Sequence, residues 1–366
     1  MKRILTLFLV CLLTVSLFSA CTPAETGTEE TCATLTEVTE EEDTVPDSEK
    51  VDASVPVRNS TGSWELVYTY DKKGNLLEAR ELSDGKELSR SEYTYDKKGN
   101  RLTSVDYAEG KEKDRSEYTY DENGNALSWT NYVMGEKNEV FYTYDENGRM
   151  LTLTHRRDGE EKTRIHYRYE AFEEPVEEAF YENGAENGKN LREFDAEGRL
   201  LRESYVKDDL EVNATIYAYD DKGNLVQELY TSYELEEGKY VYLYDDKGNK
   251  TEEHYYYIGE EVSHTVFTYD EKGNCLEERT LADGLEVEKR SYTYNDAGKL
   301  SESKWFAEGD MVEQVNYTYD EKGNLLSETY LDRYGQNAVY TYEYATLRVT
   351  KEKAEELEKV AAIGED

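Results

Sequence analysis

The sequence has little of what usually anchors a compact globular fold. Its 366 residues include 4 cysteines, 4 prolines and 4 histidines, and only 37% of them are hydrophobic. Cysteines this few and this far apart exclude a disulfide framework. The apolar content is too small for a thick two-layer core, whereas a thin sheet that buries one face needs less.

Positive charge is scarce as well. The chain carries 82 acidic against 43 basic residues, for a formal net charge of −39. Nucleic acids are polyanions that proteins grip with basic patches, so a nucleic-acid partner is excluded, and direct contact of the body with anionic lipid is equally disfavoured. We interpret the negative charge as protection against edge-to-edge association of strands. Binding of cations or basic proteins is the open alternative.

What the sequence does have is tyrosine, in a tandem repeat. There are 34 tyrosines against 8 phenylalanines and 3 tryptophans. The unit Tyr-x-Tyr-Asp-x-x-Gly-Asn, as in 93–100, returns every 25 residues, with one step of 24. Each unit can bury its apolar face only by stacking on its neighbours, so the repeat decides the fold. The turn aspartates are Asp71, Asp96, Asp121, Asp145, Asp195, Asp220, Asp245, Asp270 and Asp320, with Glu170 and Asn295 in the two remaining registers.

Each repeat predicts two antiparallel strands and two turns. The paired tyrosines share one face of the first strand, and the aspartate and glycine form a turn with a following bulge. An apolar residue three places after the glycine opens the second strand, which ends at a looser turn such as Asp84-Gly85. Residues 61–349 therefore predict an all-β meander of about 22 strands. Because open sheets rarely pass ~10 strands without curling, we expect a spiral or partly closed shell with tyrosines on its inner face.

The N-terminal segment carries an export signal. Lys2 and Arg3 precede an apolar run over 4–18 that is too short to span a membrane comfortably. The following Leu-Phe-Ser-Ala-Cys sequence, which ends at Cys21, resembles the lipobox of bacterial lipoproteins, although Phe18 stands where leucine is usual. The resemblance implies a signal peptide over 1–20, lipidation of Cys21 and anchoring at the extracytoplasmic face of a bacterial membrane. An ordinary secretory signal is the alternative.

Two further segments flank the repeat. Residues 21–60 are rich in Thr, Glu, Ser and Pro and lack apolar periodicity, so we predict a disordered acidic stalk. Residues 350–366 predict a short helix that caps the last strand, with Ala354, Leu357 and Ala361 as its apolar seam.

The motif resembles the YD repeat, also called the RHS repeat, of bacterial RHS toxins, insecticidal toxin complexes and teneurins. The resemblance covers roughly residues 64–349 and implies strands that spiral into a hollow β-shell. Large toxin shells also carry an autoproteolytic core segment that releases a C-terminal cargo. We see no such motif after Val349 and expect a short stand-alone array without core or cargo.

The repeat departs from its pattern over residues 164–199. The fifth register has no turn glycine and contains Pro175, and the sixth has Phe194 in place of a tyrosine. Because the spacing survives, we expect the strands to survive too. The departures indicate either drift at a tolerant position or a specialised acidic loop in which the side chains of Glu173, Glu174, Glu177 and Glu178 protrude.

Catalytic and metal motifs are sparse. The turn aspartates resemble calcium ligands, but most copies place a lysine two residues later, which would repel the ion. The histidines form two pairs that flank hairpin turns, His155 with His166 and His254 with His264. No cysteine or carboxylate completes either set at a recognisable spacing, and no nucleophile motif is present. We therefore predict no metal, no cofactor and no enzymatic activity.

The function that fits these features is a lipid-anchored cell-surface scaffold that binds or adheres to carbohydrate or protein. Aromatic platforms stack on sugar rings and peptide side chains, and extended repeat surfaces are used for recognition. Two alternatives stay open: a structural shell or the immunity or chaperone partner of a toxin, and a hydrolase with its site in 164–199. The expected ligand-facing aromatics are Tyr93, Tyr95, Tyr118, Tyr120, Tyr142, Tyr144, Tyr217, Tyr219, Tyr242 and Tyr244.

Overall fold

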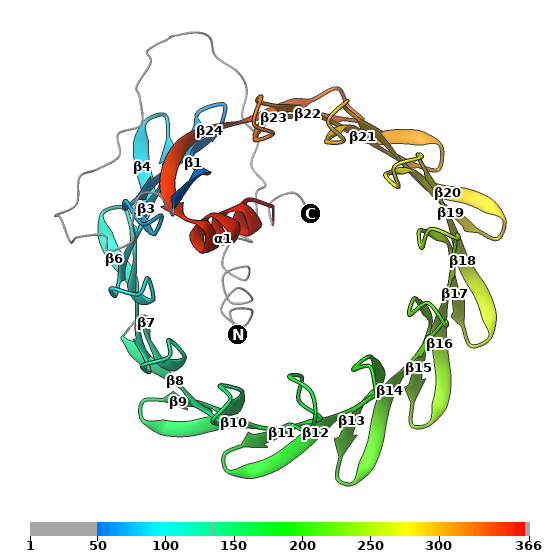
Figure 1. Cartoon of the computed structure of the whole chain (residues 1–366), viewed down its shortest axis with the longest axis horizontal. Helices are drawn as coiled ribbons and strands as arrows, with labels where there is room; N and C mark the ends of the chain where they lie inside the picture. The colour runs from blue at the N-terminus through cyan, green and yellow to red at the C-terminus, as the bar shows by residue number, and fades with distance from the viewer. Residues whose placement is uncertain (1–49, 134, 363–366) are drawn as a thin grey trace.

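The computed structural model describes residues 50–133 and 135–362 as one closed ring of antiparallel strands with a helix inside it (Figure 1). The predicted signal peptide, Cys21 and the predicted stalk up to residue 49 lie outside the described residues. Within them, the meander has 24 strands, which confirms the all-β prediction and slightly exceeds the expected strand number. No helix in this part of the chain is long and apolar enough to cross a membrane.

The strands follow one another around the ring in chain order, each paired with the next. Their bounds are β1 Lys50–Thr61, β2 Trp64–Tyr70, β3 Leu76–Ser83, β4 Lys86–Tyr95, β5 Arg101–Ala108, β6 Lys111–Tyr120, β7 Ala126–Val133, β8 Glu136–Tyr144, β9 Met150–Arg157, β10 Glu160–Arg168, β11 Glu177–Glu182, β12 Ala185–Phe194, β13 Leu200–Lys207, β14 Leu210–Tyr219, β15 Leu225–Ser232, β16 Leu235–Tyr244, β17 Lys250–Tyr257, β18 Glu260–Tyr269, β19 Cys275–Ala282, β20 Leu285–Tyr294, β21 Leu300–Ala307, β22 Asp310–Tyr319, β23 Leu325–Asp332 and β24 Asn337–Thr350; the helix is α1 Lys351–Ala362.

Ring closure depends on β1, which the sequence placed in the stalk. This strand pairs with β24 from Lys50↔Thr350 to Ser60↔Thr341 and also pairs with β2. The prediction of disorder is therefore wrong for residues 50–60. The missed signal is the alternation of Ala53, Val55 and Val57, all of which are buried. The proline at 56 lies at a register shift in the pairing, a position that strands tolerate.

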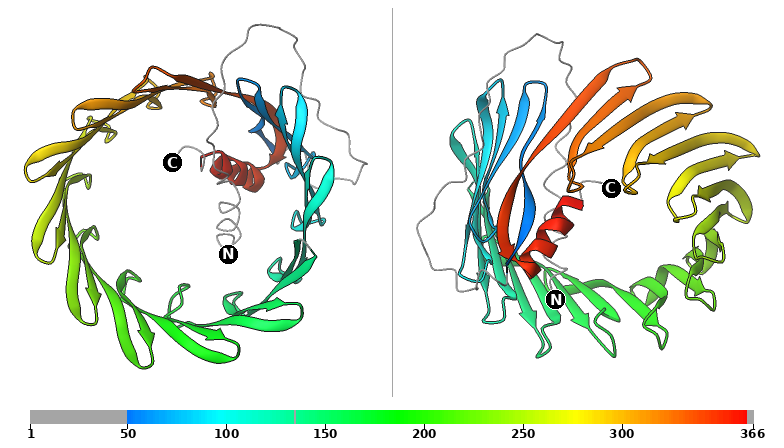
Figure 2. Two further views of the ribbon diagram at one scale, coloured as in Figure 1. Left: turned by 180° about the vertical axis from the view of Figure 1, so that it is seen from behind. Right: turned by 45° about the horizontal axis from the view of Figure 1, so that its top comes forward.

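A compact hydrophobic core lies at this seam. Ala53 and Val55 of β1, Leu347 of β24, and Ala354 and Leu357 of α1 pack into one cluster. Two further views place the helix inside the ring (Figure 2). The C-terminal helix is confirmed, but its role differs from the expected one: β1 already pairs the edge of β24, so α1 covers the inner face of the seam. The side chain of Ala361 lies outside the described part of the chain.

The tyrosine track faces the interior of the ring. Tyr68 and Tyr70 of β2 pack against the same cluster as Ala354 of α1, and α1 lies inside the ring. Side chains alternate between the two faces of a strand, and the antiparallel register carries the Tyr68 face across the sheet to Tyr93 and onward. The expected tyrosine ladder on the inner face is therefore confirmed.

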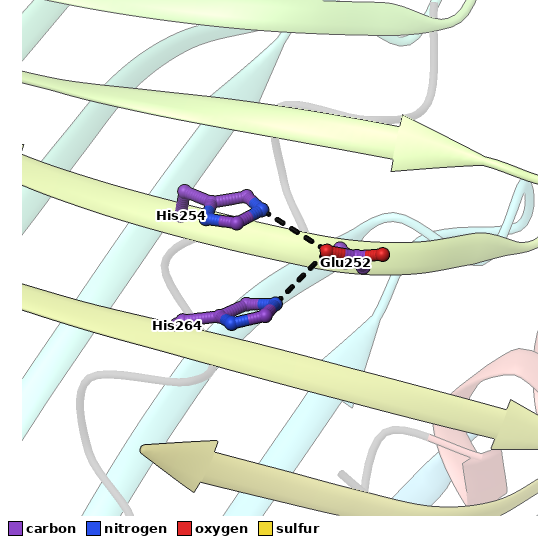
Figure 3. A group of neighbouring side chains, drawn as sticks. All are labelled: Glu252, His254 and His264. Atoms are coloured by element: carbon purple, nitrogen blue, oxygen red, sulfur yellow. Dashed lines mark hydrogen bonds and ion pairs between the residues drawn. The ribbon is translucent and has the colours of Figure 1, made fainter. Parts of the chain in front are cut away.

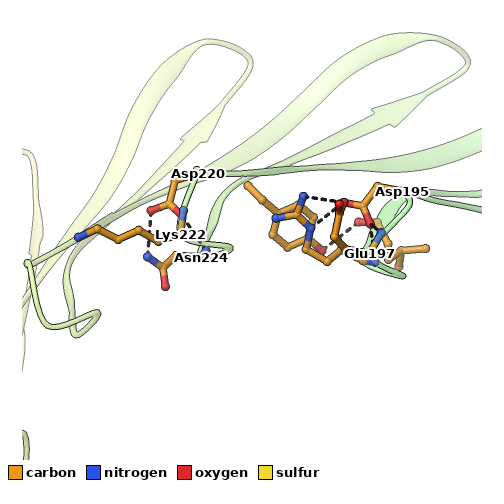
Figure 4. Close-up of polar contacts among 8 residues, drawn as sticks. Asp195, Glu197, Asp220, Lys222 and Asn224 are labelled. Atoms are coloured by element: carbon orange, nitrogen blue, oxygen red, sulfur yellow. Dashed lines mark hydrogen bonds and ion pairs between the residues drawn. The ribbon is translucent and has the colours of Figure 1, made fainter.

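The Asp-x-x-Gly-Asn turns are built around the aspartate carboxylate. Oδ1 of Asp220 accepts hydrogen bonds from the amides of Lys222 and Asn224 at 2.9 and 2.8 Å, and its Oδ2 accepts one from Nδ2 of Asn224 at 2.9 Å. In the neighbouring turn, Arg199 replaces the asparagine and donates from Nε to Asp195 at 2.6 Å (Figure 4). The carboxylate thus satisfies the turn amides, as the sequence predicted.

The second turn of most repeats is tighter than expected; the β23–β24 connection is instead a four-residue turn in which the amide of Gly335 donates to the carbonyl of Asp332 at 3.0 Å. Asp84 and Gly85 have φ angles of 49° and 72°, which is the type I′ geometry of a two-residue hairpin. Because the chain runs up and down around the ring, the aspartate turns gather on one rim and these two-residue turns on the other. The two rims therefore expose different chemistry.

The apolar anchor of the second strand also sits one residue earlier than the sequence indicated. Met150 and Leu325, two places after the turn glycine, are 7% and 9% exposed, whereas the expected anchors Leu151 and Leu326 are 38% and 40% exposed. A bulge explains the difference, because it sets Met150 directly opposite Tyr144 on the inner face.

Candidate functional site

The second tyrosine of most Tyr-x-Tyr pairs joins two repeats through a hydrogen bond from its hydroxyl. The hydroxyl of Tyr120 donates to the carbonyl of Arg101 at 2.8 Å, and that of Tyr219 donates to the carbonyl of Leu200 at 2.9 Å. Burial raises the pKa of Tyr120 to about 12, so the hydroxyl stays a donor at neutral pH. The same bond, across one repeat, is made by Tyr95, Tyr144, Tyr244, Tyr269, Tyr294 and Tyr319. Five of the ten expected ligand-facing tyrosines therefore have a structural task.

The first tyrosines of the pairs line the same wall and are half-buried by their neighbours. The guanidinium of Arg101 lies 4.7 Å from the ring of Tyr93. Tyr142, Tyr217 and Tyr242 continue the track. The structure thus brings all ten predicted tyrosines to one luminal wall, where the first member of each pair contributes its ring face.

A tyrosine and glutamate cluster interrupts this regular wall on β15 and β16. Glu228 accepts hydrogen bonds from the hydroxyls of Tyr230 and Tyr242 at 2.5 and 3.0 Å. The ring of Tyr240 lies edge-on to Tyr230 at 6.1 Å and stacks on Tyr255 at 4.7 Å. We call these residues, Glu228, Tyr230, Tyr240 and Tyr242, the Glu228 site.

The same arrangement recurs four repeats later, on β23 and β24. Glu328 accepts a hydrogen bond from Tyr342 at 2.5 Å, and the rings of Tyr330 and Tyr340 meet edge-on at 5.5 Å. These four residues and Ala338 line an open hollow of about 450 Å³. We call Glu328, Tyr330, Tyr340 and Tyr342 the Glu328 site.

A small residue lies opposite the central tyrosine at both sites. Gly238 lies directly opposite Tyr230 in the sheet, and Ala338 lies directly opposite Tyr330. Burial is the largest cause that raises the pKa of Tyr242 well above its usual range, and the hydrogen bond to Glu228 is the second. The phenols therefore remain neutral donors beside a carboxylate. Such a surface offers ring faces for stacking and polar groups for hydroxyl ligands.

Sequence reasoning named only Tyr242 of these eight residues. The others were missed because Tyr230, Tyr240, Tyr330 and Tyr340 lie outside the repeat motif. A signal was available. Glu-x-Tyr is followed by Tyr-x-Tyr, with the first tyrosine of the second motif ten positions after the tyrosine of the first, at 228–242 and again at 328–342.

The irregular repeat keeps its strands, as expected. The ring of Phe172 lies beside the turn glycine Gly198 and 5.7 Å from the ring of Phe194, and Pro175 lies in the connection before β11. Glu173 and Glu174 are exposed. The alternative of a protruding acidic loop does not hold for Glu177 and Glu178, because both belong to β11.

Glu178 of this region is held in an ion-pair cluster. Arg192 bonds Glu178 and Glu203 at 2.8 Å each, and all three lie on the inner face of β11, β12 and β13. Arg192 stands where a regular repeat has its first tyrosine. The cation thus compensates both carboxylates, and the trio takes the place of an aromatic ring in the wall.

The fold brings together only one of the two histidine pairs. His155 lies opposite Thr163, and His166 lies opposite Thr152, so the first pair is not brought together. His254 and His264 lie directly opposite each other, and Glu252 reaches both rings (Figure 3). The expectation that no carboxylate completes the second set is therefore wrong, since Glu252 is two residues from His254 on the same strand face.

No protein-family model and no curated protein matches this chain. Among solved structures, the crystal structure of TcdB2-TccC3-TEV is 16% identical, with a TM-score of 0.43, over 72% of this chain and 14% of that chain. TcdB2-TccC3 without its hypervariable C-terminal region is 15% identical, with a TM-score of 0.37, over 76% and 18%. A porin-like protein from Bacteroides uniformis is 11% identical, with a TM-score of 0.27, over 63% and 95%. The chain thus spans under a fifth of these two toxin chains, and similarity at this level assigns neither family nor function.

Proposed function

We propose that this chain is an exported, lipid-anchored binding scaffold that takes carbohydrate on its luminal wall, through the Glu228 and Glu328 sites, without a catalytic step. The observation that carries the proposal is the recurrence of one tyrosine and glutamate arrangement at two places on the same face. Export and anchoring rest on the lipobox resemblance at Cys21. The assignment to the YD-repeat type rests on the Tyr-x-Tyr-Asp-x-x-Gly-Asn motif.

Carbohydrate is favoured over other ligands by the chemistry of the two sites. Tyrosine rings stack on the C–H faces of sugars, and carboxylates accept hydrogen bonds from sugar hydroxyls. With a net charge of −39, the chain repels acidic polymers, so a neutral glycan fits best. Two equivalent sites on one wall also suit a repetitive polymer, because a second contact on the same chain raises the overall affinity.

The proposal is tested by co-sedimentation of the chain with insoluble neutral polysaccharides and with purified cell wall, at low and high salt. We expect pelleting that resists salt and is competed by a soluble sugar, since stacking is not screened by ions. Tyr240→Ala and Tyr340→Ala should each weaken pelleting, and the double variant should abolish it.

Two further variants make this test specific. Tyr334→Ala, at the exposed tip of the β23–β24 hairpin, is the matched control and should pellet like the parent chain. Glu328→Gln keeps the shape of its site while it removes the charge. The soluble sugar should then compete less effectively with the polysaccharide for this variant. A folded chain that pellets with none of the polymers, or one that Tyr334→Ala impairs as much as Tyr340→Ala, would overturn the proposal.

A purely structural shell is the second candidate, and the tyrosine hydrogen bonds between repeats favour it. If the wall served only to hold the repeats together, Tyr240→Ala and Tyr340→Ala would lower the unfolding temperature and leave every binding assay unchanged. Circular dichroism melts of the same variants therefore separate the two functions.

A further inference from the structure

The cluster of Glu252, His254 and His264 lies outside the luminal sites. Glu252 and His254 stand two residues apart on β17, and His264 of β18 is the direct partner of His254. The intervening Glu253 pairs with Tyr242 and so belongs to the inner face. By strand alternation, the three side chains of the cluster lie on the outer face of the ring.

The three side chains of the cluster meet at one carboxylate oxygen. The two imidazole rings stack with centroids 4.1 Å apart and planes 12° from parallel. Nε2 of His254 and Nε2 of His264 lie 3.2 and 3.0 Å from the same oxygen, Oε2 of Glu252 (Figure 3). One potential ligand atom from each of the three residues lies within 4.8 Å of the other two. A tetrahedral zinc ion with bonds of about 2.0–2.1 Å places its ligands about 3.3 Å apart, close to the separations of 3.2 and 3.0 Å.

A second carboxylate orients one of the rings. The bulge between Tyr255 and Tyr256 sets Glu261 on the same face, and its Oε1 lies 2.6 Å from Nδ1 of His254. In the neutral ring, a proton on Nδ1 that is donated to Glu261 leaves the lone pair of Nε2 pointing at Glu252. A carboxylate behind the outer nitrogen of a histidine is the usual support of a metal ligand.

A divalent metal can accept lone pairs from all three residues at once, and its charge offsets the carboxylates of Glu252 and Glu261. The side chains are 18%, 31% and 38% exposed for His254, His264 and Glu252, which leaves access for the ion and for a water ligand.

We propose that Glu252, His254 and His264 form a binding site for a first-row divalent transition metal, with Zn²⁺ as the best fit, and that Glu261 positions His254. Imidazole nitrogen with one carboxylate suits zinc, copper or nickel, whereas calcium and magnesium prefer oxygen ligands alone. The site ties β17 to β18 on the outer face and keeps one position open for water.

The test is equilibrium dialysis of the untagged full-length chain against Zn²⁺ at neutral pH, with metal content measured by mass spectrometry. Cobalt substitution adds an independent readout, since tetrahedral Co²⁺ absorbs strongly in the visible range. We expect one tightly held ion per chain and a tetrahedral cobalt spectrum. His254→Ala, His264→Ala and the near-isosteric Glu252→Gln should each lose both signals.

Two variants complete the design. Glu261→Gln should retain the site with an affinity about 10- to 100-fold weaker, as expected for a residue behind a ligand. His166→Ala, which removes a histidine from an outer face where no partner histidine stands opposite, is the matched control and should bind like the parent chain. Melts recorded in EDTA check that every variant is folded.

The proposal fails if the folded parent chain retains no zinc or gives an octahedral cobalt spectrum. It also fails if Glu252→Gln and His264→Ala bind as the parent does, because the surface carboxylates would then account for the metal. These outcomes are independent of any polysaccharide binding on the luminal wall.

Discussion

At the scale of single residues, the turn aspartates show how one side chain organises a repeat. The carboxylate of Asp121 accepts the amides of Asn123 and Asn125 and the side-chain amide of Asn125, each at 2.8 Å. The side-chain bond from Asn125, with the backbone bonds of the same turn, holds the pKa of Asp121 below its usual range. A group bound this way favours the folded chain only while it is ionised.

Asp121→Asn should therefore lower the unfolding temperature at pH 7. Because the folded pKa lies below that of the unfolded chain, the stabilisation is complete above the ordinary value of 3.8 and is lost as the pH falls through the folded pKa. The difference between parent and variant should shrink in thermal melts as the pH falls below 3.8. Asp246→Asn, at a fully exposed carboxylate, controls for relief of net charge. An unchanged difference at low pH would contradict this account.

At the scale of the hairpin, the two-residue turns differ in how well their sequence suits their backbone. Most place glycine second, but Tyr233-Glu234 and Asp208-Asp209 hold two residues each at positive φ; for Glu234 the angle is 64°. The left-handed region costs an L-residue roughly 1–2 kcal/mol, since Cβ approaches a carbonyl oxygen. The ring therefore carries strain at the ends of β13–β14 and β15–β16.

Glu234→Gly should relieve this strain and stabilise the chain by about 1 kcal/mol, because glycine adopts positive φ without a Cβ clash. Urea unfolding monitored by tyrosine fluorescence measures the gain. Glu236→Gly, two residues on within β16, is the matched control and should destabilise, because glycine loses more backbone entropy than other residues when the strand forms. Equal destabilisation by both substitutions would show that the turn is not strained.

At the scale of the whole molecule, closure distinguishes this sheet from an open spiral. Strand β1 removes the last exposed edge, and the cluster around Val55 and Leu347 gives the seam a packed core that the rest of the thin wall lacks in the described residues. The contact joins segments about 280 residues apart, as in the 2.7 Å hydroxyl contact between Ser60 and Thr341. A closed ring of this kind leaves no strand edge for association.

Ser60→Cys combined with Thr341→Cys should form an intramolecular disulfide under mild oxidation. The four native cysteines are replaced by serine in this variant. The pair replaces two hydroxyls that touch across adjacent strands, a separation that a disulfide can bridge. Mass spectrometry and non-reducing electrophoresis detect the bond. The pair Thr94→Cys with Thr103→Cys, in an equivalent contact, is the positive control, and Ser60→Cys with Thr103→Cys is the negative one. Disulfide-linked dimers alone would indicate an open sheet.

Much of the fold follows from the sequence, because a repeat of fixed length repeats its local physics. The period, the shared face of the tyrosines, the aspartate turns and the helix at 351–362 are all local, and all are confirmed. The apolar anchor was misplaced by one residue, since a bulge decides which of Met150 and Leu151 faces inward. Strand β1 was missed because its few small, alternating apolar residues are a weak local signal. Their pairing with β24, which buries them, is a long-range contact.

The sequence by itself determined the strands, the turns and the aromatic inner face, since each follows from hydrogen bonding and alternation within one repeat. Tertiary structure alone decided three things: that the ring closes through β1, that Glu228 and Glu328 each meet tyrosines from two strands, and that Glu252 reaches both histidines. The physical reason is register. Which side chains meet across a sheet depends on how strands are paired and where bulges shift them, and no single strand contains that information.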